Sequence, residues 1–273
     1  MKEEQKISLA HLTAIECPPP ELIWLASLAG FNYVGIRPIM LGLPGEKNYD
    51  LANLPEMLAD TKAAIKETGV GVYDIELARI TDGVDVAKYA PAMEVAAELG
   101  ASCVLSSIWT NDKDFYIDKF GELCDLAAGF GLTVNLEFVT WASVKNLQEA
   151  LEVLNAVNRK NMGIMVDTLH FHRSRVELEE LDAVPREWFH CVHLCDAPDP
   201  IPEHKDGLIH TGRGERYYVG EGSIDIIGIL KHIPPVVYVI ELPHINRTLR
   251  FGSAYHVKKC LDTLKQYLAK ASL

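Results

Sequence analysis

The chain has 273 residues, 48% hydrophobic and 23% charged, a balance that is typical of a globular protein and excludes a disordered or fibrous chain. The formal net charge of −12 argues against a DNA or RNA partner, because phosphate binding needs a basic surface. No apolar run reaches the roughly 18 residues of a membrane helix, and the N-terminus has no apolar signal core. We expect a cytoplasmic protein without a nucleic-acid or membrane partner.

Short apolar runs rich in β-branched residues recur along the chain and predict eight strands. The predicted strands span residues 7–14, 33–39, 71–78, 103–108, 133–139, 163–168, 191–195 and 236–242.

Amphipathic runs with helical spacing lie between most of these strands. The predicted helices span residues 54–68, 85–99, 118–130, 147–158, 178–183, 224–232 and 254–268. Two of them end just before Gly100 and Gly131, as helices commonly do. Strict alternation of strand and helix implies a parallel sheet, and continuous apolar strands imply that both of its faces are covered.

Eight strand–helix units in 273 residues fit a (β/α)8 TIM barrel better than an open α/β sheet. No Gly-x-Gly-x-x-Gly follows the first predicted strand, which weakens a dinucleotide-binding alternative. No linker or low-complexity tract interrupts the chain, so we predict one domain over residues 1–273.

The six cysteines are scattered and form no C-x-x-C pair. Cys191 and Cys195 lie four residues apart in one predicted strand, so they cannot face each other as a disulfide requires. We expect six reduced, buried thiols.

One connection, residues 197–222, is longer than most loops and follows the predicted seventh strand, on the face where barrel active sites lie. It contains Arg213 and Arg216 beside glycines, and these side chains would suit a phosphate or carboxylate. The alternative is that they are solvated loop charges. We expect this connection to close over a substrate.

Four predicted strands carry an ionisable residue near their carboxyl ends: Glu137, Asp167, His193 and Glu241. A lone carboxylate is costly to bury unless it is paired or binds a cation, and these strand ends would converge above the barrel mouth. Two glutamates, an aspartate and a histidine suit Mn²⁺, and also Mg²⁺, Co²⁺ or Zn²⁺. The alternative for each residue is a structural hydrogen bond or a local ion pair.

The order of these four residues, together with VDTLH at 166–170, VHLCD at 192–196 and GEGSID at 220–225, resembles the sugar phosphate isomerase/epimerase family of xylose isomerase-like TIM barrels. That family includes ketose 3-epimerases, hydroxypyruvate isomerase and inosose dehydratase. The resemblance implies one divalent metal held by the four residues, with Glu137 and Glu241 as catalytic acid and base on opposite faces of the substrate. The expected reaction is isomerisation or epimerisation of a ketose, inosose or related polyhydroxy carbonyl compound through a metal-stabilised enediolate.

Further candidates for binding a sugar or cyclitol substrate are His170, Glu76 and Trp109, in addition to Arg213 and Arg216. The resemblance implies that His170, which we place in the loop after the sixth strand, contacts a substrate oxygen. Ordinary packing or ion pairing is the alternative for each. His11 fits a buried structural histidine better than a ligand.

Three other functions compete with this prediction. A dehydratase would use the same site, but dehydratases of the family typically add a histidine near strand five, and residues 138–141 contain none. A DNA-repair endonuclease shares the barrel but needs a richer histidine cluster and a basic face. A non-catalytic carbohydrate-binding subunit would keep the metal without the chemistry. The oligomeric state is open, with a homo-oligomer as one option.

Overall fold

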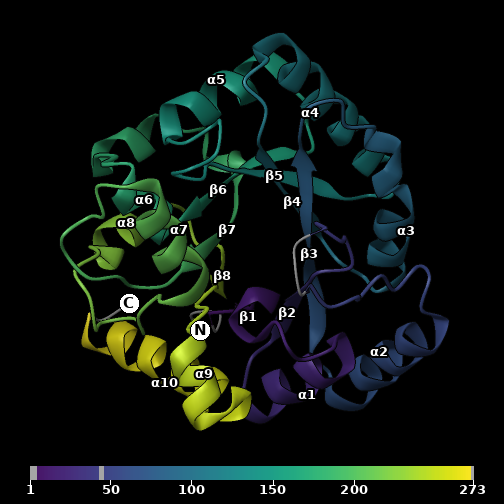
Figure 1. The fold of residues 1–273 in the computed structure, drawn as a ribbon, viewed down its shortest axis with the longest axis vertical. Helices are drawn as coiled ribbons and strands as arrows, with labels where there is room; N and C mark the ends of the chain where they lie inside the picture. Colours follow the sequence, from purple (N-terminus) through teal and green to yellow (C-terminus); the bar gives the residue numbers. More distant parts are fainter. Residues whose placement is uncertain (1–4, 43–45, 272–273) are drawn as a thin grey trace.

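Eight parallel strands close into a barrel in the order β1 to β8 in the computed structural model, which describes residues 5–42 and 46–271 (Figure 1). The strands are β1 Ile7–Leu9, β2 Tyr33–Ile36, β3 Gly71–Ile80, β4 Cys103–Ile108, β5 Thr133–Glu137, β6 Met162–Asp167, β7 Phe189–Leu194 and β8 Val237–Ile240. The single-domain (β/α)8 barrel predicted from the sequence is therefore confirmed.

The α-helices form a ring around the barrel in Figure 1, in which the last helix, α10, packs against the first, α1. They are α1 Pro19–Ala29, α2 Pro55–Thr68, α3 Ala90–Glu98, α4 Lys113–Ala128, α5 Leu147–Val157, α6 Thr168–Arg173, α7 Lys205–Gly214, α8 Ile226–His232, α9 Ile245–Phe251 and α10 Ser253–Lys270. No helix in the described ranges is both long and apolar enough to cross a membrane.

The first predicted strand is too long, because β1 ends at Leu9 and His11–Ala14 form a 3₁₀-helix. The Thr13 hydroxyl donates to the Ile240 carbonyl at 2.9 Å and accepts from the Leu242 N–H at 2.9 Å. These bonds draw the chain across the end of β8, so the apolar run leaves the sheet early. His11 is a buried structural histidine, with Nε2 2.8 Å from the Cys17 carbonyl and Nδ1 accepting from the Arg37 N–H at 2.9 Å.

Helices α1, α6, α7 and α9 were not predicted, and α4 begins earlier than predicted. Two of these departures had a signal in the local sequence. Helix α1 was not predicted, although prolines open it and Gly30 closes it with a φ of 99°. Helix α4 begins at Lys113 rather than at residue 118, because the Asp112 side chain accepts the Phe115 N–H and caps it.

The long connection after β7 is an ordered element rather than a simple loop, and it contains helix α7. Beyond α7, the Asp196 carboxylate accepts the backbone N–H groups of Gly220, Gly222 and Ile224 at 3.0, 2.9 and 3.1 Å. These bonds fold the connection back to the end of β7. All six cysteines are buried and free, as predicted.

Candidate functional site

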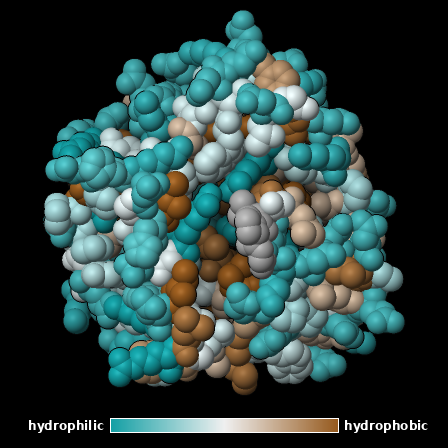
Figure 2. Space-filling model, viewed as in Figure 1, coloured by the Kyte–Doolittle hydropathy of each residue, from teal (hydrophilic) through white to brown (hydrophobic). Residues whose placement is uncertain are grey.

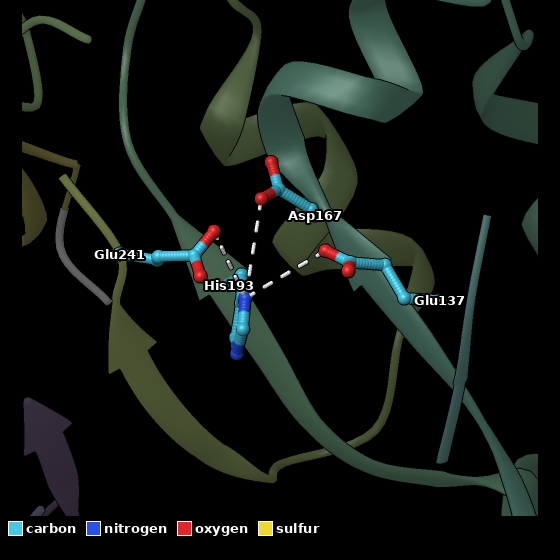
Figure 3. A group of neighbouring side chains, drawn as sticks. All are labelled: Glu137, Asp167, His193 and Glu241. Carbon is cyan, nitrogen blue, oxygen red and sulfur yellow. Dashed lines mark ion pairs between the residues drawn. The ribbon is translucent and has the colours of Figure 1, made fainter. Parts of the chain in front are cut away.

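Four side chains meet at the carboxyl ends of β5 to β8 (Figure 3). Glu137 and Asp167 are the last residues of β5 and β6, His193 lies in β7, and Glu241 directly follows β8. One potential ligand atom from each residue lies within 4.8 Å of the others, and all four residues are buried. The structure therefore brings together the whole set predicted to bind a metal.

His193 is the centre of this cluster. Its Nδ1 lies 3.9 Å from Glu137 Oε1, 3.9 Å from Asp167 Oδ2 and 3.6 Å from Glu241 Oε2. Neither ring nitrogen has a hydrogen-bond partner among the described residues, although the side chain is fully buried. Leaving a buried polar group unpaired costs about 1–3 kcal/mol, whereas a divalent cation would use the ring nitrogen and the carboxylates together. The residues present fit such a cation.

Arg216 lies against the same cluster, almost fully buried. Its Nη1 is 2.6 Å from Asp167 Oδ2, and its Nη2 is 2.8 Å from Glu241 Oε2. Nη1 also donates to the Glu241 carbonyl at 3.0 Å, and Nε donates to the Gly212 carbonyl at 2.9 Å. Arg216 is thus a counter-charge for two carboxylates rather than a solvated loop residue.

The two glutamates of the cluster differ in their electrostatic environment. Burial and the nearby Glu241 carboxylate raise the pKa of Glu137 to about 8. Burial also disfavours the charged form of Glu241, but Arg216 and His193 outweigh it and hold the pKa of Glu241 well below its usual range. Paired carboxyl groups with divergent proton affinities are typical of acid/base sites.

A cavity of about 370 Å³ opens above the cluster. In Figure 2 it corresponds to the hollow at the centre of the face, bordered by both hydrophilic and hydrophobic side chains. Of the predicted site residues, those that line it are Glu137, Glu241, His170, Trp109, Arg213 and Arg216. Asp167 and His193 lie beneath them in the cluster.

Glu76 is not among the residues that line this cavity. Its side chain is fully buried within β3, and Oε2 accepts from Arg37 Nε at 2.6 Å. Arg37 also approaches Glu241, with Nη2 3.6 Å from Oε1. The structure places Glu76 as a partner of Arg37, and its predicted contact with substrate remains a prediction.

Residues 23–262 match the sequence profile of the family described as xylose isomerase-like TIM barrel. The chain belongs to this family. The inosose isomerase of Bacillus subtilis (strain 168) is 32% identical over 113 residues, which are 40% of this chain and only 38% of that protein. The ketose 3-epimerase of Arthrobacter globiformis is 26% identical over 251 residues, 80% of this chain and 78% of that one. A crystal structure of IolI protein with a bound zinc atom superposes with a TM-score of 0.81 at 23% identity, covering 97% of this chain and 99% of that one.

His170 reaches the cavity of this family member from helix α6, not from the loop that we predicted. The helix begins directly after β6 because Asp167 Oδ1 accepts the Leu169 N–H at 2.7 Å. The His170 ring packs edge-on against Trp141 with centroids 4.8 Å apart, and its Nδ1 lies 2.9 Å from Thr140 Oγ1. Burial lowers the pKa of His170 to about 4, so the ring is neutral.

Sequence reasoning missed Arg79, which lines the cavity with its guanidinium 4.5 Å from the Trp109 ring centroid. The predicted third strand ended at residue 78, but β3 continues to Ile80 and carries Arg79 to the barrel mouth. Its position after an apolar run, like that of the four cluster residues, was the signal available in the sequence.

Proposed function

We propose that the protein is a divalent-metal-dependent isomerase or epimerase of a ketose, inosose or related polyhydroxy carbonyl compound. The observation that carries this proposal is the buried His193, which has no hydrogen-bond partner among the described residues and is surrounded by three carboxylates at a cavity floor. Relatives named inosose isomerase and ketose 3-epimerase support the reaction class.

Glu137, Asp167, His193 and Glu241 would hold the cation. Manganese is our first candidate because the set is rich in oxygen; magnesium, cobalt and zinc also suit it, and the IolI structure contains zinc. Bound there, a divalent cation would supply Lewis-acid polarisation of the substrate carbonyl, which acidifies the neighbouring C–H.

Proton transfer falls to Glu137 and Glu241, whose side chains line one cavity from different strands. β6 and β7 separate β5 from β8, so the two carboxylates approach a substrate from different sides. One carboxylate removes the proton next to the carbonyl, and the other returns a proton. Return to the opposite face of the same carbon inverts it, whereas return to the neighbouring carbon exchanges aldose and ketose.

The remaining cavity residues would bind and orient the substrate. The neutral His170 ring can contact a hydroxyl oxygen, and the indoles of Trp109 and Trp141 provide apolar walls for a carbon skeleton.

The decisive test is solvent deuterium incorporation, followed by NMR, with a panel of ketoses and inososes and protein whose metal content is known. Glu137→Gln and Glu241→Gln, loaded with excess Mn²⁺, should each lose turnover by about 100- to 10,000-fold, the range supplied by a positioned acid or base. Each variant should keep proton exchange from one epimer only. Glu152→Gln, on the exposed face of α5 and outside the cavity, is the matched control and should behave as wild type.

Full activity in both glutamine variants would contradict the assignment of the proton chemistry to these residues. Loss of water from the substrate would identify a dehydratase instead. Binding without any exchange would identify a non-catalytic carbohydrate-binding protein.

A further inference from the structure

Two arginines on the cavity wall lack the counter-charges that the other arginines there possess. Arg79 extends from β3 and Arg213 from α7, and both line the cavity that contains Glu137 and Glu241. Arg37 and Arg216 have carboxylate oxygens at 2.6 Å. Among the residues that the structure describes, none places a carboxylate oxygen within 4.0 Å of the Arg79 or Arg213 guanidinium.

The Arg79 guanidinium is held in place, but its side-chain N–H groups have no hydrogen-bond partner among the described residues. Its face stacks on the Trp109 ring, and the Trp109 indole is itself fixed by donating to Ser107 Oγ at 2.8 Å. A cation–π contact occupies the face of a guanidinium and leaves the N–H groups at its edge available. Consistent with this, the buried Nε of Arg79 has no hydrogen-bond partner in the described part of the chain.

The neighbouring charges do not neutralise this position. Burial, together with the nearby Arg213 and Arg37 guanidiniums, lowers the pKa of Arg79 to about 10. Glu137 and Glu46 act in the opposite direction but do not compensate. Arg79 therefore lies among positive groups of which only Arg37 has a carboxylate partner among the described residues, and an anion bound beside Arg79 would offset this repulsion.

Arg213 is positioned by a close approach of its helix to the cavity wall. The neighbouring Gly212 lies against Trp141, where a Cβ atom would be 2.3 Å from Trp141 Cη2. Only glycine lets α7 come this near, so the helix carries Arg213 to the cavity rather than away from it.

We infer that the substrate carries an anionic group, a phosphate or a carboxylate, which Arg79 and Arg213 bind while its polyhydroxy carbonyl end lies at the cluster of Glu137, Asp167, His193 and Glu241. This inference rests on the proposed function and narrows its substrate class. Guanidinium groups bind both anions through charge-assisted, bidentate hydrogen bonds. A neutral sugar would leave the buried Nε of Arg79 without a partner, whereas Arg213 is exposed and would add a second positive charge at the cavity edge.

The test compares three substrates on the metal-loaded protein: a phosphorylated ketose, the same ketose without phosphate, and a ketose bearing a carboxylate. Deuterium incorporation should be most efficient with one of the two anionic compounds, and which one identifies the anion. Arg79→Met and Arg213→Met should each raise KM for that compound about 10- to 100-fold, as expected for a lost hydrogen bond to a charged group. Arg79→Lys should raise KM less than Arg79→Met does, because lysine keeps the positive charge but not the paired N–H donors of the guanidinium.

Arg250→Met is the matched control, because Arg250 is exposed on α9 and stacks on Phe251, 5.1 Å from its ring centroid, outside the cavity. Equal efficiency with the neutral ketose, and an unchanged KM in Arg79→Met and Arg213→Met, would overturn the inference while leaving the proposed function intact. Failure of the proposed function would look different. No compound would exchange deuterium, yet calorimetry would show that the anionic compounds bind and that both methionine variants bind them more weakly. The anion site would then stand, and the proposed reaction would be wrong.

Discussion

The two halves of the barrel mouth carry opposite charges and compensate them differently. On the β5–β8 half, three carboxylates surround His193, and Arg216 neutralises two of them from within the protein. On the β2–β4 half, Arg37 is paired with Glu76, but Arg79 is stacked on Trp109 without a carboxylate partner among the described residues. The first half lacks a partner for its histidine and fits a cation, whereas the second lacks a partner for an arginine and fits an anion.

The largest expected difference between the two halves concerns metal binding. It is tested by neutralising one buried carboxylate in each half, Asp167 in the first and Glu76 in the second. Asp167→Asn keeps the Oδ1 acceptor that caps α6 but removes a charged ligand. Its affinity for Mn²⁺ should fall by more than about 100-fold, since residues outside a ligand set already change affinity by about 10- to 100-fold. Glu76→Gln on the other half should retain the metal. Equal metal content of the two variants by elemental analysis would show that metal binding is not confined to the β5–β8 half.

A second difference should appear in stability, through the two arginines that are paired. In metal-free protein, Arg216→Met leaves two buried carboxylates without their partner and should lower the free energy of unfolding by about 3–5 kcal/mol. Arg37→Met should cost less, because that side chain is 17% exposed whereas that of Arg216 is 2% exposed.

Added Mn²⁺ should raise the melting temperature of Arg216→Met more than that of Arg37→Met, because a cation would replace the missing charge beside Asp167 and Glu241. Denaturant titration and thermal melting, with and without the cation, measure both effects. Identical responses of the two variants to Mn²⁺ would show that Arg216 does not compensate the cluster.

The smallest effect concerns the packing of α7 on Trp141, which places Arg213 at the cavity. Gly212→Ala forces α7 and Trp141 apart, at a cost of about 1–3 kcal/mol for overpacking, and should raise KM by displacing Arg213. Lys205→Ala, at the exposed start of the same helix, should leave KM unchanged. If Gly212→Ala matches this control in steady-state kinetics, the contact between α7 and Trp141 does not position the cavity wall.

Much of the cluster could be predicted from sequence because parallel strands share a direction. Glu137 and Asp167 end apolar runs that were assigned as strands, and in a closed parallel barrel the carboxyl ends of all strands face one mouth. Local sequence also contained signals that we missed, such as Asp112 at the start of α4 and the prolines that open α1. Arg79 was not predicted as a site residue because the predicted third strand ended at residue 78, two residues before the end of β3.

By itself, the sequence determined the barrel and the meeting of four ionisable side chains, because strand periodicity and chain order suffice for both. The tertiary structure alone decided how the charges are paired. Arg216 neutralises Asp167 across 49 residues of chain, and Arg37 binds Glu76 across 39. Such pairs depend on through-space distance and burial, which local pattern does not encode. The same reason explains why, of the four arginines that line the cavity, Arg37 and Arg216 have a carboxylate partner among the described residues and Arg79 and Arg213 have none.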